Sequence, residues 1–318
     1  MKILVTGATG LVGKALCKRL LNDGYAPRAA VRTTDAALAT LGLDTATVGD
    51  INELTDWHTT LLGVDVVVHL AARVHVMRDR AENPLDEFRR VNAQGTLQLA
   101  RSACAAGVER FIFVSSVKVN GDFTKPGQAF TEHAPSKPMD AYGQSKHEAE
   151  IGLQKMAQES GMEVVIIRPP LVYGPGVKAN FATLMNAVQK GWPLPLGAVN
   201  NQRSLVALDN LVDFIVTCTT HPQAANQIFL VSDGHDLSTT ELVQGMAEAA
   251  GVPARLLPVP AWALRPAGAA LGKRDAVQRL CGNLQVDISK ARELLGWTPP
   301  VSVSEGLRRA MAGTDSLN

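Results

Sequence analysis

MKILVTGATGLVGKALCKRLLN, residues 1–22, is the stretch that decides the fold of this chain. Lys2–Thr6 is a short apolar run of the kind found in buried strands. Glycines then stand at positions 7, 10 and 13, and Leu11–Asn22 carries apolar residues at the period of an amphipathic helix. The stretch therefore predicts a strand, a tight turn and a helix, in that order.

The spacing Gly7-x-x-Gly10-x-x-Gly13 between a strand and a helix is typical of a dinucleotide-binding turn. Its glycines permit a tight turn, let the backbone approach a pyrophosphate and let the helix pack closely on the sheet. Backbone N–H groups and the positive end of the helix dipole then hold the phosphates. The alternative is an ordinary strand–helix turn in which glycine only relieves strain. The expected contacts are Gly7, Thr9, Gly10, Leu11, Val12 and Gly13.

The rest of the first half alternates short apolar strands with helices, which is the pattern of a parallel sheet covered on both faces. The expected strands are Ala29–Val31, Val64–Leu70, Phe111–Ser115, Glu163–Arg168 and Ile228–Val231, and the expected helices are Asn92–Gly107 and Tyr142–Gly161. From Pro169 onward proline and glycine become dense, which indicates loops that enter a second region. We predict an α/β protein with a doubly wound parallel Rossmann sheet and a smaller mixed C-terminal substrate lobe. The sheet domain is expected to comprise residues 1–171 and about 206–233, and the lobe about 172–205 and 234–318.

The composition excludes several classes of protein. With 46% apolar and 19% charged residues among 318, the chain is neither disordered nor a coiled coil. Its net charge of +1 gives no reason to expect bulk attraction to nucleic acid or to an anionic membrane. The longest uncharged stretch, Phe214–Ser232, is interrupted by polar residues and cannot span a bilayer. The four cysteines lie far apart with no CxxC pair, so we expect a cytoplasmic protein without a metal site. The charge balance and the interrupted apolar stretch predict no nucleic-acid partner and no membrane insertion.

A positive charge stands where the second strand ends. Dinucleotide-binding folds commonly place an acid about 20 residues after the glycine turn to hold the ribose 2′-OH of NAD, whereas an Arg accommodates the 2′-phosphate of NADP. This chain has Arg32 there, which favours NADP(H), with NAD(H) as the alternative, unless Arg32 is only a solvated charge. Asp50, followed by Ile51, is a candidate contact for the adenine amino group, or else a cap of the next helix.

Tyr142-Gly143-Gln144-Ser145-Lys146 places a phenol and an ammonium four residues apart on one helix face. A free tyrosine has a pKa near 10, and a fixed positive charge nearby is expected to lower it toward the range useful for acid–base catalysis. Interconverting an alcohol and a ketone needs such a group, because a proton must leave or enter the oxygen while hydride moves at carbon. Ser116, just past an expected strand, can hydrogen-bond the same oxygen.

Taken together, these motifs resemble the extended short-chain dehydrogenase/reductases, and the chain is similar throughout to their UDP-hexose 4-epimerase branch. The motifs that carry the resemblance are the glycine turn, His69-Leu70-Ala71-Ala72, Val91-Asn92-x-x-Gly95-Thr96, Ser115-Ser116, Tyr142-x-x-x-Lys146 and Arg168-Pro169-x-x-Val172-Tyr173-Gly174-Pro175-Gly176. The resemblance implies a homodimer that pairs through the two expected helices Asn92–Gly107 and Tyr142–Gly161.

The resemblance also implies roles for individual residues. The implied catalytic triad is Ser116, Tyr142 and Lys146, with Lys146 also holding the nicotinamide ribose. The further implied cofactor contacts are Leu70, Ala71, Ala72, Asn92, Pro169 and Val172. The implied contacts to a UDP-sugar are Arg73, Ser116, Lys118, Asn180, Arg203 and Arg279, with Arg274 as a competitor of Arg279 for the diphosphate.

Arg203 and several other motif residues also have plain structural interpretations. Arg203 is either a surface charge or a diphosphate ligand, and the planar guanidinium favours the ligand. Asp209 with Asn210 is expected to cap a helix. His69, His75 and Trp297 are expected to be structural.

Two departures from the family pattern narrow the function. The related 4,6-dehydratases carry an Asp-Glu pair after the catalytic Ser or Thr, but this chain has Val117 and Lys118, which argues against dehydration. Asn120 replaces the usual Tyr of Val-Tyr-Gly. Together with Ala72–Met77, this segment resembles a subgroup met in bacterial O-antigen synthesis. Some members of that subgroup are UDP-glucose 4-epimerases, and others resemble C4-reductases of a UDP-4-keto-6-deoxy-N-acetylhexosamine.

Three functions are compatible with these residues. The first is an NADPH-dependent C4 ketoreductase of such a keto sugar, which Arg32 and Lys118 favour. The second is a 4-epimerase of UDP-glucose or UDP-N-acetylglucosamine that retains NAD. The third is a dinucleotide-sensing regulator, against which the intact Ser116, Tyr142 and Lys146 argue.

Overall fold

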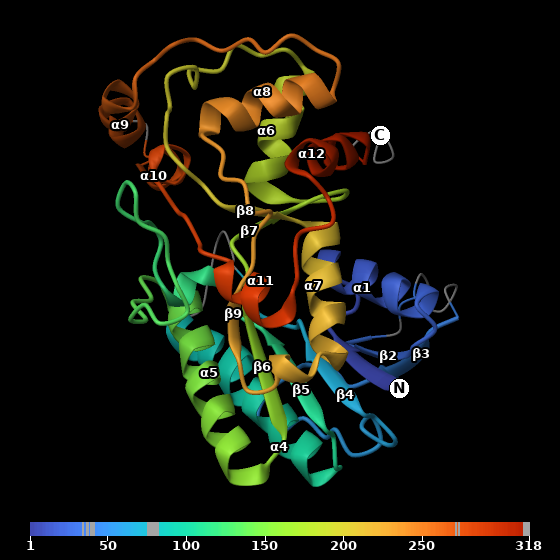
Figure 1. Ribbon diagram of the computed structural model, residues 1–318. Helices are drawn as coiled ribbons and strands as arrows, with labels where there is room; N and C mark the ends of the chain where they lie inside the picture. The colour runs from blue at the N-terminus through green and yellow to red at the C-terminus, as the bar shows by residue number, and fades with distance from the viewer. Residues whose placement is uncertain are drawn as a thin grey trace.

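The structure is a computed structural model that describes residues 1–33, 35, 38, 42–74, 83–270, 272 and 274–313. Its described strands form a seven-stranded parallel sheet in the order β3-β2-β1-β4-β5-β6-β9 (Figure 1). The strands are β1 (Lys2–Thr6), β2 (Ala26–Val31), β3 (Asp44–Thr47), β4 (Val66–His69), β5 (Arg110–Val114), β6 (Glu163–Arg168) and β9 (Ile228–Leu230). From β1 the chain adds β2 and β3 on one side of the sheet, and then β4, β5, β6 and β9 on the other. This is the strand order of a doubly wound dinucleotide-binding sheet, so the predicted fold class is confirmed.

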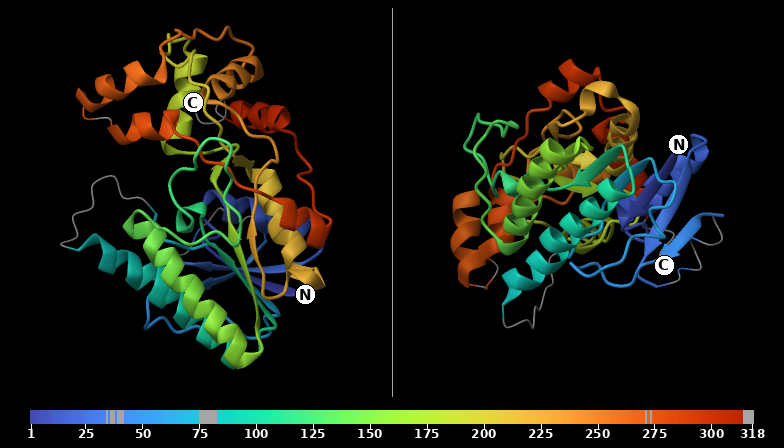
Figure 2. Two further views of the ribbon diagram at one scale, coloured as in Figure 1. Left: turned by 60° about the vertical axis from the view of Figure 1, so that its left-hand side comes forward. Right: turned by 90° about the horizontal axis from the view of Figure 1, so that it is seen from below.

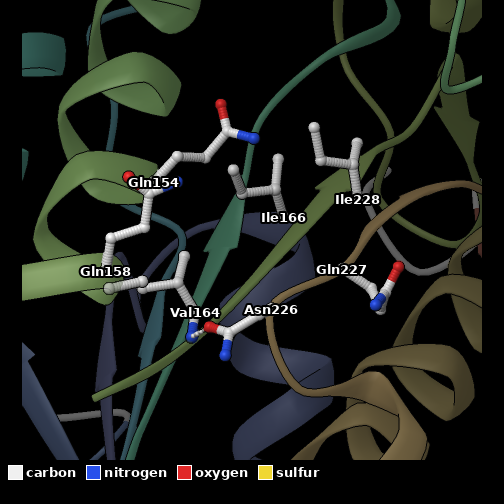
Figure 3. A pocket seen from close by; sticks show the side chains of 8 residues that line it. Gln154, Gln158, Val164, Ile166, Asn226, Gln227 and Ile228 are labelled. Atoms are coloured by element: carbon white, nitrogen blue, oxygen red, sulfur yellow. Dashed lines mark hydrogen bonds between the residues drawn. The ribbon is translucent and has the colours of Figure 1, made fainter. Parts of the chain in front are cut away.

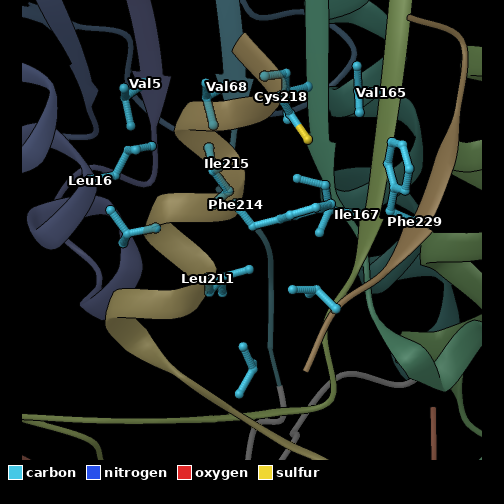
Figure 4. Close-up of a cluster of buried hydrophobic side chains, with 14 of the residues drawn as sticks. Val5, Leu16, Val68, Val165, Ile167, Leu211, Phe214, Ile215, Cys218 and Phe229 are labelled. Carbon is cyan, nitrogen blue, oxygen red and sulfur yellow. The ribbon is translucent and has the colours of Figure 1, made fainter. Parts of the chain in front are cut away.

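Helices cover both faces of the sheet. On one face, α1 (Leu11–Asn22), α7 (Leu208–Thr220) and α11 (Ser289–Leu295) pack over a buried apolar cluster that includes Leu16, Phe214 and Phe229 (Figure 4). On the other face, α4 (Thr96–Ala105) and α5 (Ala141–Ser160) pack over a cluster around Phe111 and Phe113. The central strands are buried on both sides, which explains their continuous Val and Ile runs.

A smaller lobe stands over the carboxyl ends of the strands (Figures 1 and 2). It contains the two-stranded sheet of β7 (Leu171–Tyr173) and β8 (Leu205–Ala207), and the helices α6 (Ala179–Gln189), α8 (Thr239–Ala249), α9 (Ala261–Ala270), α10 (Arg274–Cys281) and α12 (Val303–Ala312). Its own apolar cluster includes Tyr173, Phe181 and Met246. The domain boundaries drawn from the sequence stay a prediction.

The observed elements differ from the expected ones at several points. Strand β3 and the pair β7 and β8 were not expected, and the helix expected at Asn92–Gly107 is a π-helix (Arg89–Gly95) followed by α4. The short helix α3 (Pro84–Phe88) precedes it, and 3₁₀ turns occupy Val117–Val119 and Pro222–Ala224. Residues 75–77 of the Ala72–Met77 motif lie outside the described residues.

Candidate active site

The candidate site lies where the carboxyl ends of β1, β4, β5 and β6 face the lobe (Figures 1 and 2). In a sheet of this order, ligands bind in the crevice at the point where the strand order reverses, which here lies between β1 and β4. The glycine turn follows β1, the His69-Leu70-Ala71 segment follows β4, and Ser116 follows β5. The topology therefore brings the predicted cofactor and catalytic motifs to one edge of the sheet.

The glycine turn has no room for side chains. Gly7 has φ +68°, and a Cβ on it would lie 2.8 Å from the Ala71 nitrogen. A Cβ on Gly13 would contact the Gly7 carbonyl oxygen and lie 2.7 Å from Ala8 Cα. Helix α1 begins after Gly10, without a side-chain cap and without an acidic residue in its first turn. Close backbone packing and an uncapped, acid-free helix start fit a bound pyrophosphate, so the described residues are suited to a dinucleotide.

Behind the turn, a chain of hydrogen bonds ties β1, β4 and α4 together. The Thr6 hydroxyl oxygen accepts from the backbone N–H groups of Leu70 (3.2 Å) and Ala71 (3.1 Å), so its proton points to His69 Nδ1 at 2.7 Å. Nε2 of His69 lies 2.9 Å from Thr96 Oγ1, which donates to the Asn92 carbonyl (2.7 Å). These partners assign the neutral Nε2–H tautomer to His69. Burial lowers its pKa to about 3, and the Lys146 charge acts in the same direction, which accords with the structural role expected for His69.

Asn92 extends this chain to the catalytic helix. Its side-chain oxygen accepts from the Arg73 backbone N–H (2.8 Å), and its amide donates to the Arg73 carbonyl (3.0 Å) and to Ser145 Oγ (3.0 Å). Asn92 is fully buried, and the Arg73 guanidinium lies 5.6 Å from the centre of the Phe88 ring. The side chain of Asn92 thus links the Arg73 backbone to Ser145 of α5.

Ser116 and Tyr142 are brought together from different elements. Ser116 follows β5 in an extended conformation, and its Oγ accepts from the Lys118 backbone N–H at 3.2 Å. Tyr142 lies in the first turn of α5, where Asp140 caps the helix by accepting from the Gly143 N–H at 2.7 Å. A hydrogen bond joins Tyr142 to Ser116 and lowers the pKa of the phenol, but burial and then the Asp140 charge raise that pKa to about 12.

Lys146 lies one turn further along α5 and is almost fully buried. Its Nζ donates to the Val114 carbonyl (2.9 Å) and lies 4.4 Å from the centre of the Phe113 ring. Burial lowers the pKa of Lys146 to about 7, and the Glu150 charge opposes that shift. The Tyr142 pKa is therefore raised and not lowered as expected, because burial and the Asp140 charge together outweigh the hydrogen bond with Ser116.

A buried ion pair lies one turn along α5 from Lys146. Arg168, at the end of β6, makes several hydrogen bonds to the Glu150 carboxylate, with Nε–Oε1 at 3.0 Å, and both side chains are nearly fully buried. Nη1 of Arg168 also donates to Asn120 Oδ1 at 3.1 Å. Asn120 was singled out as a departure from the family pattern, but its buried partner was not foreseen. The Arg168 of the Arg-Pro motif and the unusual Asn120 were the two sequence signals for this network.

Lys118 does not point freely toward a sugar. Its Nζ lies 2.9 Å from Asp122 and 2.6 Å from Asp140, and these carboxylates raise its pKa although burial opposes them. Arg32 is likewise paired, with Nε 3.0 Å from Asp50 Oδ1, and both side chains are more than 70% exposed. No helix follows Asp50 among the neighbouring residues 51–74, so the alternative of a helix cap there is wrong.

The other expected cofactor contacts lie on segments that follow or flank these strands. Ile51 lies against the π-helix, because a Cβ on Gly95 would come within 2.8 Å of its Cγ2. Ala72 is half-buried directly after Ala71. The Pro169 carbonyl accepts from the Val117 N–H at 3.0 Å, and Val172 lies in β7 at the base of the lobe.

In the lobe, Arg203 is half-buried rather than a surface charge. Its Nη1 donates to the carbonyls of Arg279 (2.7 Å) and Gly282 (3.1 Å), and burial followed by the Arg279 charge lowers its pKa. Two guanidinium groups thus lie near each other at one place in the lobe. The expected cap at Asp209 is wrong, because α7 begins after Ala207 and Asp209 pairs with Arg309 at 2.7 Å.

Asn180, the remaining lobe residue implied by the resemblance, is exposed at the start of α6. A cavity of about 890 Å³ lies beside the segment that leads to Arg203 and is lined by residues of the 123–127 loop, of the 199–202 segment and of α9 and α10, among them Arg265 and Arg274. Its volume is in the range of small-molecule sites. Arg274 lines this cavity, whereas Arg279 lies beside Arg203.

A second cavity lies away from this edge. It measures about 190 Å³ and is formed by the later part of α5, by β6 and by the segment before β9 (Figure 3). Gln154, Gln158, Asn226 and Gln227 supply its polar groups, and no titratable side chain lines it. Within the described ranges there is no group of three or more His, Cys, Asp or Glu that could hold a metal, and no helix long and apolar enough to cross a membrane.

Comparison with known proteins extends this description. Residues 3–232 match the model of the NAD dependent epimerase/dehydratase family. A UDP-glucose 4-epimerase of Vibrio cholerae is 53% identical over 309 residues, which cover 96% of this chain and 93% of that protein. Among solved structures, a UDP-glucuronic acid 4-epimerase of Bacillus cereus in complex with NAD has a TM-score of 0.80 at 23% identity, covering 100% of this chain and 99% of that one. A UDP-glucose 4-epimerase of Thermotoga maritima with UDP-glucose has a TM-score of 0.79 at 23% identity, with the same coverage.

Proposed function

The chain belongs to the NAD dependent epimerase/dehydratase family, and from this premise we propose that it is a 4-epimerase of a UDP-hexose that retains NAD. The observation that carries the proposal is the 53% identity to a UDP-glucose 4-epimerase over nearly the whole chain. The site is compatible with it, because a hydrogen bond joins Ser116 to Tyr142, Lys146 lies one turn along the same helix, and both Ser116 and the glycine turn follow strands of the same parallel sheet. The family comparison supports this function better than the ketoreductase that Arg32 and Lys118 favour on sequence grounds.

Tyr142 is the group that moves the sugar proton in this proposal. With a pKa of about 12, the phenol is protonated at neutral pH and can donate to the oxygen of a 4-keto sugar. The hydrogen bond with Ser116 lowers that pKa, so it assists the opposite step, in which Tyr142 accepts the proton of the C4 hydroxyl. A bound NAD supplies a hydride acceptor that can return the hydride to the same carbon.

Lys146 sets the electrostatics around that proton transfer. Its pKa of about 7 means that both the ammonium and the amine are populated near neutral pH. The ammonium favours a phenolate four residues away on the same helix face, and the amine does not. The Glu150 carboxylate raises the Lys146 pKa and so increases the ammonium fraction.

The positions that distinguish a dehydratase argue against that reaction. Val117 is 4% exposed and offers no acid or base. Lys118 is held by two carboxylates. Neither side chain can remove a proton from a neighbouring sugar carbon, so oxidation and reduction at C4 is the chemistry that this set of residues supports.

An epimerase must hold the nucleotide while the 4-keto sugar rotates to present its other face. Arg203, with Arg279 near it, offers positive charge in the lobe. Guanidinium groups bind diphosphate oxygens in a bidentate manner. We assign the diphosphate to this pair and the nucleoside to the adjoining cavity of about 890 Å³.

A ketoreductase remains a second candidate, because Arg32 ends β2 where it could contact a 2′-phosphate. Its Asp50 partner weakens this argument, since the carboxylate partly neutralises the guanidinium and would itself repel a phosphate. The Arg32–Asp50 pair is therefore compatible with the 2′-OH of NAD.

The test begins with the purified chain, from which bound dinucleotide is released and identified by mass. We expect stoichiometric NAD, and interconversion of UDP-glucose and UDP-galactose without added cofactor. Tyr142→Phe is the control, because it should keep the NAD and lose the conversion. NADPH consumed one for one with a UDP-4-keto-6-deoxy sugar, without epimerisation, would establish the ketoreductase instead.

We also propose that two chains pair through α4 and α5. These helices pack side by side on one face of the sheet, and Ile151 of α5 is 54% exposed. An exposed apolar side chain on a helix of this kind is well placed for a helix-to-helix interface. Light scattering at micromolar concentration should give the mass of two chains, and a single-chain mass would contradict the pairing.

A further inference from the structure

Charge is unevenly distributed along this nearly neutral chain. No Asp or Glu occurs from Val164 to Leu208, and none occurs from Ala249 to Arg274. Both segments contain Lys and Arg, and they carry two of the four tryptophans, Trp192 and Trp262. A net charge of +1 therefore conceals two long cationic segments, which the whole-chain balance could not reveal.

The fold places parts of these two segments side by side. The Leu194 N–H donates to the Arg255 carbonyl (2.8 Å), the Leu257 N–H to the Leu194 carbonyl (2.8 Å), and the Gly197 N–H to the Leu257 carbonyl (2.9 Å). The paired segments run across the end of the lobe that is farthest from the sheet and lead into α9 (Figures 1 and 2). In these views they form the outer edge of the lobe.

We define the lobe ridge as Lys190, Trp192, Arg255, Leu257 and Trp262. Trp262 is 76% exposed, Trp192 58% and Leu257 49%, whereas the other two tryptophans of the chain are at most 5% exposed. Lys190 and Arg255 are exposed on the same edge. The Lys190 ammonium lies 5.7 Å from the centre of the Trp192 ring, and Arg255 lies against Gly191. Exposed apolar and cationic side chains thus occur together on the segments that form this edge of the lobe.

From this arrangement we propose that the lobe ridge binds the surface of an anionic lipid bilayer. Tryptophan is enriched at membrane–water interfaces because its ring is apolar and its N–H is polar. Neighbouring Lys and Arg are attracted to anionic headgroups, and no acid in the two segments opposes that attraction. Exposed tryptophan side chains can enter a fluid headgroup layer without a matching groove. The interaction is peripheral and needs no membrane-spanning helix.

A protein partner fits the ridge less well. Lys is depleted at the centres of protein interfaces, and this edge would need a partner with a complementary groove. The ridge is also separate from α4 and α5, the helices proposed for pairing (Figure 1). Bilayer binding would bring the lobe, which carries Arg203, close to the membrane while the sheet stays in solution.

The test is co-sedimentation of the full chain with vesicles of phosphatidylcholine containing phosphatidylglycerol, and with phosphatidylcholine alone. We expect binding to the anionic vesicles that weakens with added salt. A blue shift of tryptophan fluorescence should accompany binding, because only Trp192 and Trp262 are exposed among the described tryptophans. Binding of equal strength to both kinds of vesicle, or none to either, would overturn the proposal.

Variants locate the interaction. Trp262→Ser together with Trp192→Ser should abolish the fluorescence shift and weaken binding at least about tenfold, and Lys190→Gln with Arg255→Gln should weaken it by a similar factor. Leu54→Ser is the matched control, because Leu54 is 84% exposed but lies outside the ridge. All variants should keep their conversion rate in solution. Anionic-vesicle binding that survives both double substitutions would contradict the assignment, as would photocrosslinking from position 262 to a protein in place of lipid.

Discussion

His69 makes the stability of this protein depend on pH in a way that can be calculated. The ring is buried as the neutral Nε2–H tautomer, between Thr6 and Thr96. A proton added at Nδ1 would face the hydroxyl proton that Thr6 directs at it, because the Thr6 oxygen already accepts from two backbone N–H groups. The folded protein therefore resists protonation of His69, and burial lowers its pKa to about 3.

The sign and size of the effect follow from the two pKa values. In the unfolded chain His69 titrates near 6.5, so below that pH the unfolded state binds a proton that the folded state refuses. The free energy of unfolding must then fall as the pH falls through 6.5, and keep falling until about pH 3. Between pH 7 and pH 5 this linkage removes about 2 kcal/mol, at about 1.4 kcal/mol for each pH unit well below 6.5.

The assay is urea unfolding at pH 7 and pH 5 and at one protein concentration, for the wild type, His69→Gln and His58→Gln. His69→Gln keeps an amide between the two threonines but removes the titration, so it should lose about 2 kcal/mol less than the wild type on acidification. His58 is exposed and serves as the matched control, which should behave as the wild type. Equal losses in wild type and His69→Gln would refute the reasoning.

Three further predictions concern the site. Tyr142→Phe should abolish conversion while dinucleotide and UDP-sugar binding stay within about threefold, and Ser116→Ala should cost on the order of 10²-fold in kcat, both measured by steady-state kinetics and binding titration. Glu150→Gln should lower the free energy of unfolding by about 3–5 kcal/mol, because it leaves the Arg168 guanidinium buried without its partner; a urea midpoint equal to that of the wild type would count against the pair. Gly13→Ala should yield protein without bound dinucleotide, since the new Cβ would meet the Gly7 carbonyl oxygen; full occupancy by mass analysis would show that the turn is dispensable.

The buried part of the fold was open to prediction because its signals are local. Helix α1 spans Leu11–Asn22 and strand β6 spans Glu163–Arg168, as expected from their periodicity. Strand β3 was missed because Asp44–Thr47 is a polar edge strand that is held by main-chain pairing with β2 and not by an apolar run. The three-residue strands β7 and β8 are too short to carry a period.

The four-residue spacing predicted that Tyr142 and Lys146 share a helix face, but it did not predict their pKa values. Tyr142 and Lys146 lie on one helix face, as their separation requires, yet Tyr142 is half-buried and Lys146 is buried, and burial moves their pKa values in opposite directions. Burial depends on packing across the whole domain, which no local pattern records. The direction of the Tyr142 shift was therefore predicted wrongly.

Pairs that are distant in the sequence were the hardest to foresee. Arg168 and Asn120 are 48 residues apart, and Lys118 and Asp140 are 22 apart. Arg32 favoured NADP when taken alone, but the fold brings Asp50 beside it and changes the electrostatics of that position. The charge of Arg32 therefore predicts cofactor preference only together with that of Asp50.

In the proposed function, the hydride leaves and returns to the same sugar carbon within one bound complex. UDP-glucose that carries deuterium at C4 tests this claim when it is incubated with the protein in ordinary water without added dinucleotide. We predict that the UDP-galactose formed keeps all of its deuterium at C4, because Tyr142 exchanges only the oxygen-bound proton. Loss of deuterium to solvent, or its appearance on free NADH or NADPH, would contradict the proposed function.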